Sequence, residues 1–352
     1  MKNSYLIIAF ALILGACKSE TKSDATITKD MSDKEKQEVN VYTHRHYEVD
    51  QMLFAKFEKQ TGIKVNVVNA KADELMQKMT LEGAQSPADV LITVDAGRLV
   101  RAKDKDLLQS VTSQILNDNI PSHLRDEDNQ WFALTKRARV IAYDKERTQP
   151  QQLSTYEDLT LPKWHNKILV RSSGNIYNQS LMASIISHKG KDDAKKWASG
   201  IVENMARTPQ GNDRDQLKAL VVGEGDVAIV NTYYIGKMLN SKDSQEVKVG
   251  ERIGVFFPNQ DGRGAHINIS GAGVAKYAPN KANAIQFIEY LASEDAQRIF
   301  ATANYEYPVN PNVKPSELLQ SWGAFKEDVL PLSKLGENNK KAVIVFDEAG
   351  WK

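Results

Sequence analysis

Two tyrosines stand side by side in the segment "NTYYIGKM", where a strand is expected to end and a helix to begin. The preceding run, Asp226 to Val230, is typical of a buried strand. A segment that needed only core volume would more often alternate its aromatic side chains or space them three or four residues apart. Adjacent phenols at Tyr233 and Tyr234 instead indicate convergence on one point.

Two further segments place side chains with useful chemistry at the same kind of junction. The segment "HRHYEVD" follows a strand expected at "VNVYT" and contains His44, His46 and Tyr47. The segment "RSSGNIYNQSL" follows "KILV" and contains Tyr177. In open α/β sheets, ligands bind beyond the carboxyl ends of the strands, where such segments gather. The three segments are therefore candidates for one shared site.

A tyrosine binds a metal only when the metal displaces the phenol proton, because the pKa of a phenol is about 10. A trivalent cation such as Fe(III) does this readily, and phenolate is a hard oxygen donor that suits it. Zinc and Cu(I) prefer imidazole and thiolate, while calcium prefers carboxylate and carbonyl oxygens. Converging tyrosines therefore favour ferric iron. The spacing "HRHYE" leaves a zinc site of His44, His46 and Glu48 as an alternative.

The elements that would position these side chains alternate between strands and helices. Strands are expected at "VNVYT", "KVNVV" and "ADVLIT", with a helix after the first that stops at Gly62, a second from Asp73 to Gly83, and a third capped by Asp95. Two extended runs, "FALTKRARVIAYD" and "GVFFPNQDGRGAHINISGAGVAK", flank a second set of strands and helices. The sequence thus predicts an α/β protein of two lobes joined by two extended crossing segments, with a ligand cleft between the lobes.

The lobes are predicted to exchange segments. Residues 39–136 with 264–311 form the first α/β lobe, and residues 137–263 with 312–352 form the second. Helices are expected around "SELLQSW" and "FKEDVL" in the last segment, packed on the second lobe.

The N-terminal residues are typical of an exported lipoprotein. Residues 1–17 carry one lysine, an apolar stretch too short to span a bilayer and the sequence "LGAC", which resembles a lipobox that ends at Cys17. Cys17 is the only cysteine of the chain, and residues 18–38 are polar enough to form a flexible tether. We expect an extracytoplasmic protein that a lipid anchors to a bacterial membrane, in the periplasm or at the cell surface.

The composition excludes some classes of function. The 46 Lys and Arg residues nearly balance the 45 Asp and Glu residues, so no global field would attract nucleic acid or an anionic membrane surface. The chain contains no nucleophile elbow, phosphate loop or HExxH motif, and we expect a monomeric binding protein that is not an enzyme. The alternatives are a binding protein for a polyamine, thiamine or a small anion, and a metalloenzyme with tyrosine ligands.

Six stretches together resemble a bacterial ferric-iron substrate-binding protein of an ABC importer. They are "YTHRHYEVDQMLFAKFEKQTGIKV", "SPADVLITVDAGRL", "KRARVIAYD", "RSSGNIYNQSLMASI", "ARTPQGNDRDQLKAL" and "DVAIVNTYYIGKM". They span most of the chain from Val39 to about Pro308. The resemblance implies capture of Fe(III) as the two lobes close, and delivery to a membrane permease driven by a cytoplasmic ATPase.

The resemblance also implies the metal ligands. In the branch of the family with an Arg-His-Tyr opening, the ligands would be Tyr47, Tyr177, Tyr233 and Tyr234. The histidine of that opening, His46, is a ligand in some members and not in others, and His44 stands where a small residue is often found. Four phenolates around one Fe(III) leave one net negative charge, and the resemblance favours Arg137 as the nearby cation. Four tyrosines and a histidine would make an additional anion unnecessary.

Overall fold

The structure is a computed structural model that describes residues 37–352. The predicted signal peptide of residues 1–17, its Cys17 and nearly all of the tether predicted for residues 18–38 therefore lie outside the described residues. Within residues 37–352, no helix has the length and the apolar character needed to cross a membrane.

The first part of the fold alternates between strands and helices, as predicted. Its elements are β1 (Glu38–Thr43), α1 (Glu48–Thr61), β2 (Lys64–Asn69), α2 (Ala72–Glu82), β3 (Val90–Val94) and α3 (Ala96–Asp104). Strand β1 pairs in parallel with both β2 and β3. Helix α1 ends where Gly62 adopts a φ of 73°, a left-handed conformation that glycine tolerates. The Asp95 carboxylate caps α3 by accepting a hydrogen bond from the amide of Gly97.

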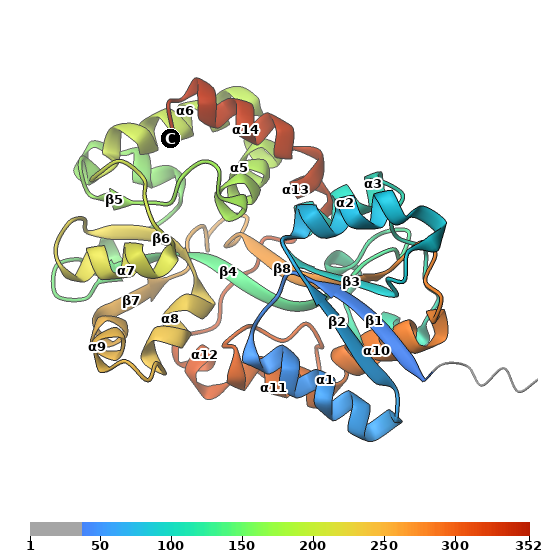
Figure 1. The fold of residues 1–352 in the computed structure, drawn as a ribbon. Helices are drawn as coiled ribbons and strands as arrows, with labels where there is room; N and C mark the ends of the chain where they lie inside the picture. The colour runs from blue at the N-terminus through green and yellow to red at the C-terminus, as the bar shows by residue number, and fades with distance from the viewer. Residues whose placement is uncertain (1–36) are drawn as a thin grey trace, which may run out of the picture. The chain divides into compact units, whose positions relative to one another are not determined.

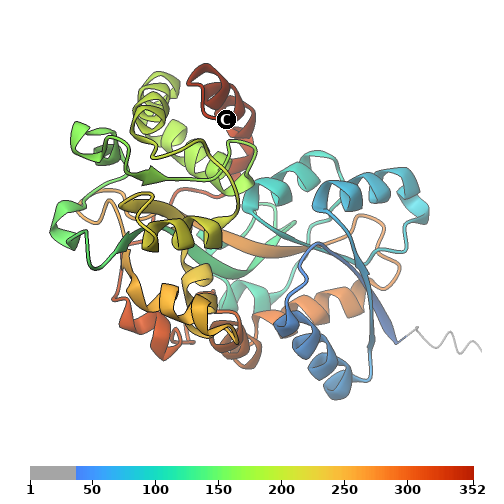
Figure 2. The same ribbon diagram turned by 60° about the vertical axis from the view of Figure 1, so that its left-hand side comes forward.

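Two long strands run antiparallel to each other through the middle of the sheet, β4 (Phe132–Asp144) and β8 (Ile267–Val274) (Figures 1 and 2). Residues 132–138 of β4 pair with β8, and β8 pairs with β3 along its other edge. Residues 139–143 of β4 pair with β6 (Val227–Asn231). Strand β4 therefore belongs to both ends of the sheet.

The second part of the fold adds the remaining strands and most of the helices. These are α4 (Gln114–Asn119), β5 (Ile168–Leu169), α5 (Ile176–Lys189), α6 (Lys191–Asn204), α7 (Asp213–Val221), α8 (Thr232–Leu239), α9 (Ser244–Arg252), β7 (Ile253–Phe256), α10 (Lys281–Ala292), α11 (Glu294–Ala303), α12 (Glu317–Ser321), α13 (Ser333–Glu337) and α14 (Asn339–Glu348). The strand order of the described sheet is β2-β1-β3-β8-β4-β6-β5, with β7 beside β4. The predicted α/β class with two extended crossing segments is confirmed, while the lobe boundaries stay a prediction.

The C-terminal segment departs from the prediction in one place. Helix α12 matches the helix expected at "SELLQSW", but residues 325–330 form no helix, so the helix expected at "FKEDVL" is wrong. The backbone there pairs with Ala265, which donates its amide to the carbonyl of Lys326 and accepts a hydrogen bond from the amide of Asp328. The ring of Phe325 also stacks on that of Phe257, with the centroids 4.2 Å apart. These tertiary contacts override the local helical pattern.

Candidate metal centre

Four tyrosines lie at the beginnings of three helices. Tyr47 immediately precedes α1, Tyr177 lies in the first turn of α5, and Tyr233 and Tyr234 lie in the first turn of α8. Each helix follows a strand-to-helix junction that the sequence predicted. The positive end of a helix dipole stabilises negative charge, so these positions favour phenolate formation.

The structure brings the four tyrosines together. The hydroxyl oxygens of Tyr177 and Tyr233 are 3.3 Å apart. The ring centroids of Tyr47 and Tyr233 are 6.4 Å apart in an edge-on arrangement, and those of Tyr233 and Tyr234 are 4.2 Å apart. Tyr47 and Tyr234 are partly buried and the other two are buried. Side chains from distant parts of the sequence therefore form one compact cluster of phenols.

The surroundings of the cluster keep the phenols of Tyr47, Tyr233 and Tyr234 neutral in the absence of metal. Burial raises the pKa of Tyr47 to about 12, and the neighbouring Tyr177 adds to the rise. Burial also raises the pKa of Tyr233 and of Tyr234 well above the usual phenol range, with repulsion from the other tyrosines as a further cause. A metal that binds these oxygens must therefore displace a proton from each of them.

A buried polar network holds the helices that carry three of the tyrosines. The guanidinium of Arg139, on β4, donates to the side-chain oxygen of Asn178 on α5 at 2.6 Å and to that of Asn231 at 3.2 Å. Asn231 is the residue that precedes α8. Thr232 is the first residue of α8, and its hydroxyl accepts a hydrogen bond from the amide of Ala138. The side chains of Asn231 and Thr232 therefore both attach the beginning of α8 to β4.

The two histidines of "HRHYEVD" have different surroundings. Nε2 of His44 lies 3.2 Å from Nη1 of Arg98, and its Nδ1 lies 3.1 Å from the hydroxyl of Thr93 and 3.4 Å from the amide nitrogen of Val94. Burial, with Arg98 as a further cause, lowers the pKa of His44 to about 3. Both ring nitrogens of His44 are thus engaged by β3 and α3. His46 is exposed, and its ring lies 5.4 Å from that of Tyr47.

The described residues do not form the zinc site of His44, His46 and Glu48 that the sequence left as an alternative. Among residues 37–352, no group of three or more His, Cys, Asp or Glu side chains is placed to hold a metal ion. The ring nitrogens of His44 contact Arg98 and Thr93.

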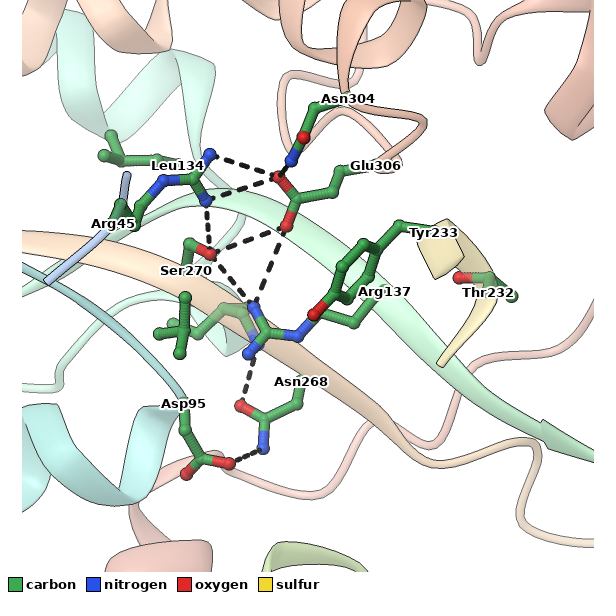
Figure 3. A network of polar contacts seen from close by, with 12 residues as sticks. Arg45, Asp95, Leu134, Arg137, Thr232, Tyr233, Asn268, Ser270, Asn304 and Glu306 are labelled. Atoms are coloured by element: carbon green, nitrogen blue, oxygen red, sulfur yellow. Dashed lines mark hydrogen bonds and ion pairs between the residues drawn. The ribbon is translucent and has the colours of Figure 1, made fainter. Parts of the chain in front are cut away.

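Arg137, the cation favoured by the resemblance, is buried beside Tyr233 (Figure 3), and its Nε and Nη2 have no hydrogen-bond partner among the described residues. Its carbon Cζ is 5.7 Å from the ring centroid of Tyr177, and its Nη1 donates to the hydroxyl of Ser270 at 3.1 Å. Glu306 lies 4.0 Å from Arg137 and 3.3 Å from Arg45, which forms a second ion pair with Asp50. Burial alone would raise the pKa of Glu306, but the two arginines lower it, so this carboxylate is ionised.

Lys237 is a second cation beside the tyrosines, and the sequence analysis missed it. Its Nζ lies 3.6 Å from the ring centroid of Tyr47 and 5.4 Å from that of Tyr233. Burial lowers the pKa of Lys237 to about 8, so the amine is mostly protonated at neutral pH. Within the described part of the chain it forms no ion pair. Its position four residues after Tyr233, on the same face of α8, is the signal that could have identified it.

The charges around the cluster leave an excess of cations. Three cationic side chains face two carboxylates on the side of Lys237, and the members of this group are Arg45, Arg137, Lys237, Asp50 and Glu306. On the side of Tyr177, Arg139 and Arg171 share the single carboxylate of Asp213. A cluster that acquires one net negative charge on binding a ligand is therefore compensated by the protein.

The chain is similar to known proteins over most of its length. Residues 85–323 match the family described as bacterial extracellular solute-binding protein. The iron uptake protein A1 of Synechocystis sp. is 51% identical over 318 residues, which cover 90% of this chain and 88% of that protein. The structure is similar to that of the IdiA (FutA) protein of Trichodesmium, solved in complex with iron and citrate ligands, with a TM-score of 0.87 and 50% identity over 90% of this chain and all of the other.

A second solved structure agrees. The ferric binding protein from Campylobacter jejuni has a TM-score of 0.85 and 46% identity, covering 89% of this chain and 100% of that chain. The two-lobe fold predicted from the sequence is therefore confirmed. The chain belongs to the family of bacterial extracellular solute-binding proteins, and its resemblance to the ferric-iron-binding members of that family is confirmed.

Proposed function

We propose that this protein binds Fe(III) through the phenolate oxygens of Tyr47, Tyr177, Tyr233 and Tyr234, with His46 as a further ligand. The observation that supports the proposal most strongly is the convergence of four phenols at the beginnings of three helices. Phenolate suits a trivalent metal, which is charged enough to displace the proton. The ferric-iron-binding relatives provide independent support.

Capture is proposed to occur as the lobes close. The first lobe, residues 39–136 with 264–311, would contribute His46 and Tyr47. The second lobe, residues 137–263 with 312–352, would contribute the remaining ligands. Closure would bring both sets onto the ion and exclude water. The loaded protein, a monomer held to the membrane by a lipid on Cys17, would then deliver iron to an ABC permease and its ATPase.

The charges around the cluster argue against the cationic alternatives. A polyamine or thiamine would enter a region where the amine of Lys237 is mostly protonated at neutral pH. Cationic organic ligands are held by carboxylates and aromatic faces, and here the face of the Tyr47 ring is already occupied by the Lys237 amine. Four phenolates around Fe(III) carry one net negative charge, which this amine would compensate.

The first test is colour. The full-length protein loaded with Fe(III) should bind one ion and turn orange to red, because electron transfer from phenolate to ferric iron absorbs visible light. The measurement is a titration that follows absorbance between the ultraviolet and the near infrared. Zinc, spermidine and thiamine should give no such band. A protein that takes up ferric iron and stays colourless would rule out phenolate ligands.

The second test concerns Lys237. The variant Lys237→Met removes the charge and keeps the length of the side chain. Ferric affinity should fall about tenfold, which is typical when a residue that contacts a metal ligand, and not the metal itself, is replaced. Competition against a chelator at neutral pH measures this loss. The absorption band should remain, because every phenol is intact. Lys237→Arg should retain most of the affinity, and Lys276→Met should behave as the unchanged protein, since Lys276 pairs with Asp106 at the surface. If all these variants bind ferric iron as tightly as the unchanged protein, the charge of Lys237 does not contribute to binding.

A further inference from the structure

Asp95 is a buried carboxylate that connects three elements of the fold. It is fully buried, and besides capping α3 it accepts hydrogen bonds from the hydroxyl of Ser180, at 2.8 and 2.7 Å to its two oxygens. It also accepts one from the side-chain amide of Asn268 at 2.8 Å (Figure 3). Ser180 lies on α5 and Asn268 on β8. One carboxylate therefore joins helix α3, the crossing strand β8 and helix α5.

The strained backbone conformation of Asp95 indicates that the hydrogen bonds of its carboxylate are needed at this position. Asp95 has a φ of 82° and a ψ of 120°, which a residue other than glycine adopts only at a cost in free energy. Its backbone amide donates to the carbonyl of Ile269 at 2.7 Å, which fixes the turn against β8. Among the described residues no lysine or arginine forms an ion pair with it, so neutral donors alone satisfy the carboxylate. Hydrogen bonds to an ionised acceptor are stronger than those between neutral groups.

The serine that Asp95 binds lies one turn after a tyrosine of the cluster. Ser180 follows Tyr177 by three residues on α5, and residues at this spacing are neighbours on one side of a helix. A hydroxyl that contacts both oxygens of a buried carboxylate fixes the rotation and the height of this first turn relative to β8 and α3. Helix α3, like the helix that Tyr47 precedes, belongs to the β1–β3 end of the sheet. The Asp95 to Ser180 contact therefore sets the position of Tyr177 relative to Tyr47.

We propose that Asp95 is a positioning residue for the tyrosine cluster, and that it acts through Ser180 to hold Tyr177 in place. The inference depends on the proposed ferric function. While the contact is made, the phenol of Tyr177 faces those of Tyr233 and Tyr47. Release of the ion requires α5 to move away from α3, and this movement breaks the contact. Asp95 thereby slows the loss of iron without touching it.

The helix that carries Ser180 offers a matched control. Ser184 is also buried, lies one turn further along α5, and donates its hydroxyl to the carboxylate of Asp328 at 3.1 Å. Ser180→Ala and Ser184→Ala thus each remove one buried hydrogen bond from a serine to an aspartate. Only the first of these bonds reaches α3 and β8.

The experiment compares the two variants with the unchanged full-length protein after loading with Fe(III). A chelator is added in excess, and the decay of the phenolate absorption band gives the rate of iron release. Ser180→Ala should release iron about tenfold faster and show a shifted band, because Tyr177 is no longer held in position. Ser184→Ala should keep both the rate and the band of the unchanged protein. A general loss of stability would not shift the band.

Each outcome decides the question. Identical rates and bands for the two serine variants would overturn the role of Asp95. Should Ser180→Ala fail to fold, Asp95→Asn decides instead, because asparagine keeps the size and the cap and adopts positive φ more readily than most residues. Its amide offers one oxygen where Ser180, Asn268 and the amide of Gly97 now share two, so iron release should again be faster. An unchanged rate in that variant would overturn the inference. A protein that binds no ferric iron before any substitution would overturn the proposed function and this inference with it.

Discussion

Replacing Tyr177 with phenylalanine is expected to weaken ferric binding by at least about 100-fold, more than the loss of a residue that only supports a ligand. The substitution removes one oxygen and leaves the ring, so the packing of α5 should survive. The hydroxyl lies 3.3 Å from that of Tyr233, in the middle of the cluster. Competition with a chelator measures the affinity, and the absorption band should shift because one of the phenolates that produce it is gone.

Tyr290→Phe is the matched control for this substitution. Tyr290 lies on α10 in contact with Phe57, and its hydroxyl has no hydrogen-bond partner among the described residues. The control removes the same atom far from the cluster and should change neither affinity nor colour. Tyr233→Phe and Tyr234→Phe should resemble Tyr177→Phe. If Tyr177→Phe leaves the ferric affinity and the absorption band unchanged, Tyr177 is not a ligand. The count of four phenolates would then be wrong, and so would the roles that this count gives to Lys237 and Arg137.

Ferric affinity is expected to fall steeply as the pH decreases below neutral. The pKa of Tyr47 is about 12, and the pKa values of Tyr233 and Tyr234 are raised further, so these phenols are protonated in the metal-free protein at every pH up to neutral. They are deprotonated in the complex, so binding releases protons. Lower pH opposes that release, and affinity changes about tenfold per pH unit for each proton exchanged.

Titrations at several pH values between neutral and mildly acidic would measure the number of protons. The slope of log affinity against pH should exceed one, and the protons released into a weakly buffered solution should match it. The variant Tyr234→Phe should release one proton fewer, which makes it the internal control. A flat dependence over this range would contradict phenolate ligands.

The positions of the tyrosines in the fold could be predicted from the sequence, because the signals are local. An apolar run followed by "NTYY", or "KILV" followed by a glycine-containing loop, defines a strand-to-helix junction without tertiary information. The carboxyl ends of strands gather at one side of a sheet, so residues at such junctions converge. The capping of α3 by Asp95 is equally local, since donor and acceptor are two residues apart.

Other features of the site could not be predicted, because they depend on partners distant in the sequence. His44 stands next to a predicted ligand, yet Arg98, which follows it by 54 residues, occupies one of its ring nitrogens. The hydroxyl of Thr232 accepts a hydrogen bond from the amide of Ala138, which lies 94 residues earlier in the chain. The ion pairs that compensate Arg137 come from Glu306, on a segment that no motif marks.

The shared strand β4 has a consequence for the way the protein denatures. Its first residues hydrogen-bond with β8 and its later residues with β6, so neither end of the sheet can lose its order while leaving an intact edge behind. Two-lobed proteins with independent cores can melt in separate steps. Here the backbone of one continuous strand is a structural member of both halves, which couples their unfolding. We therefore expect the protein to unfold in a single cooperative thermal transition.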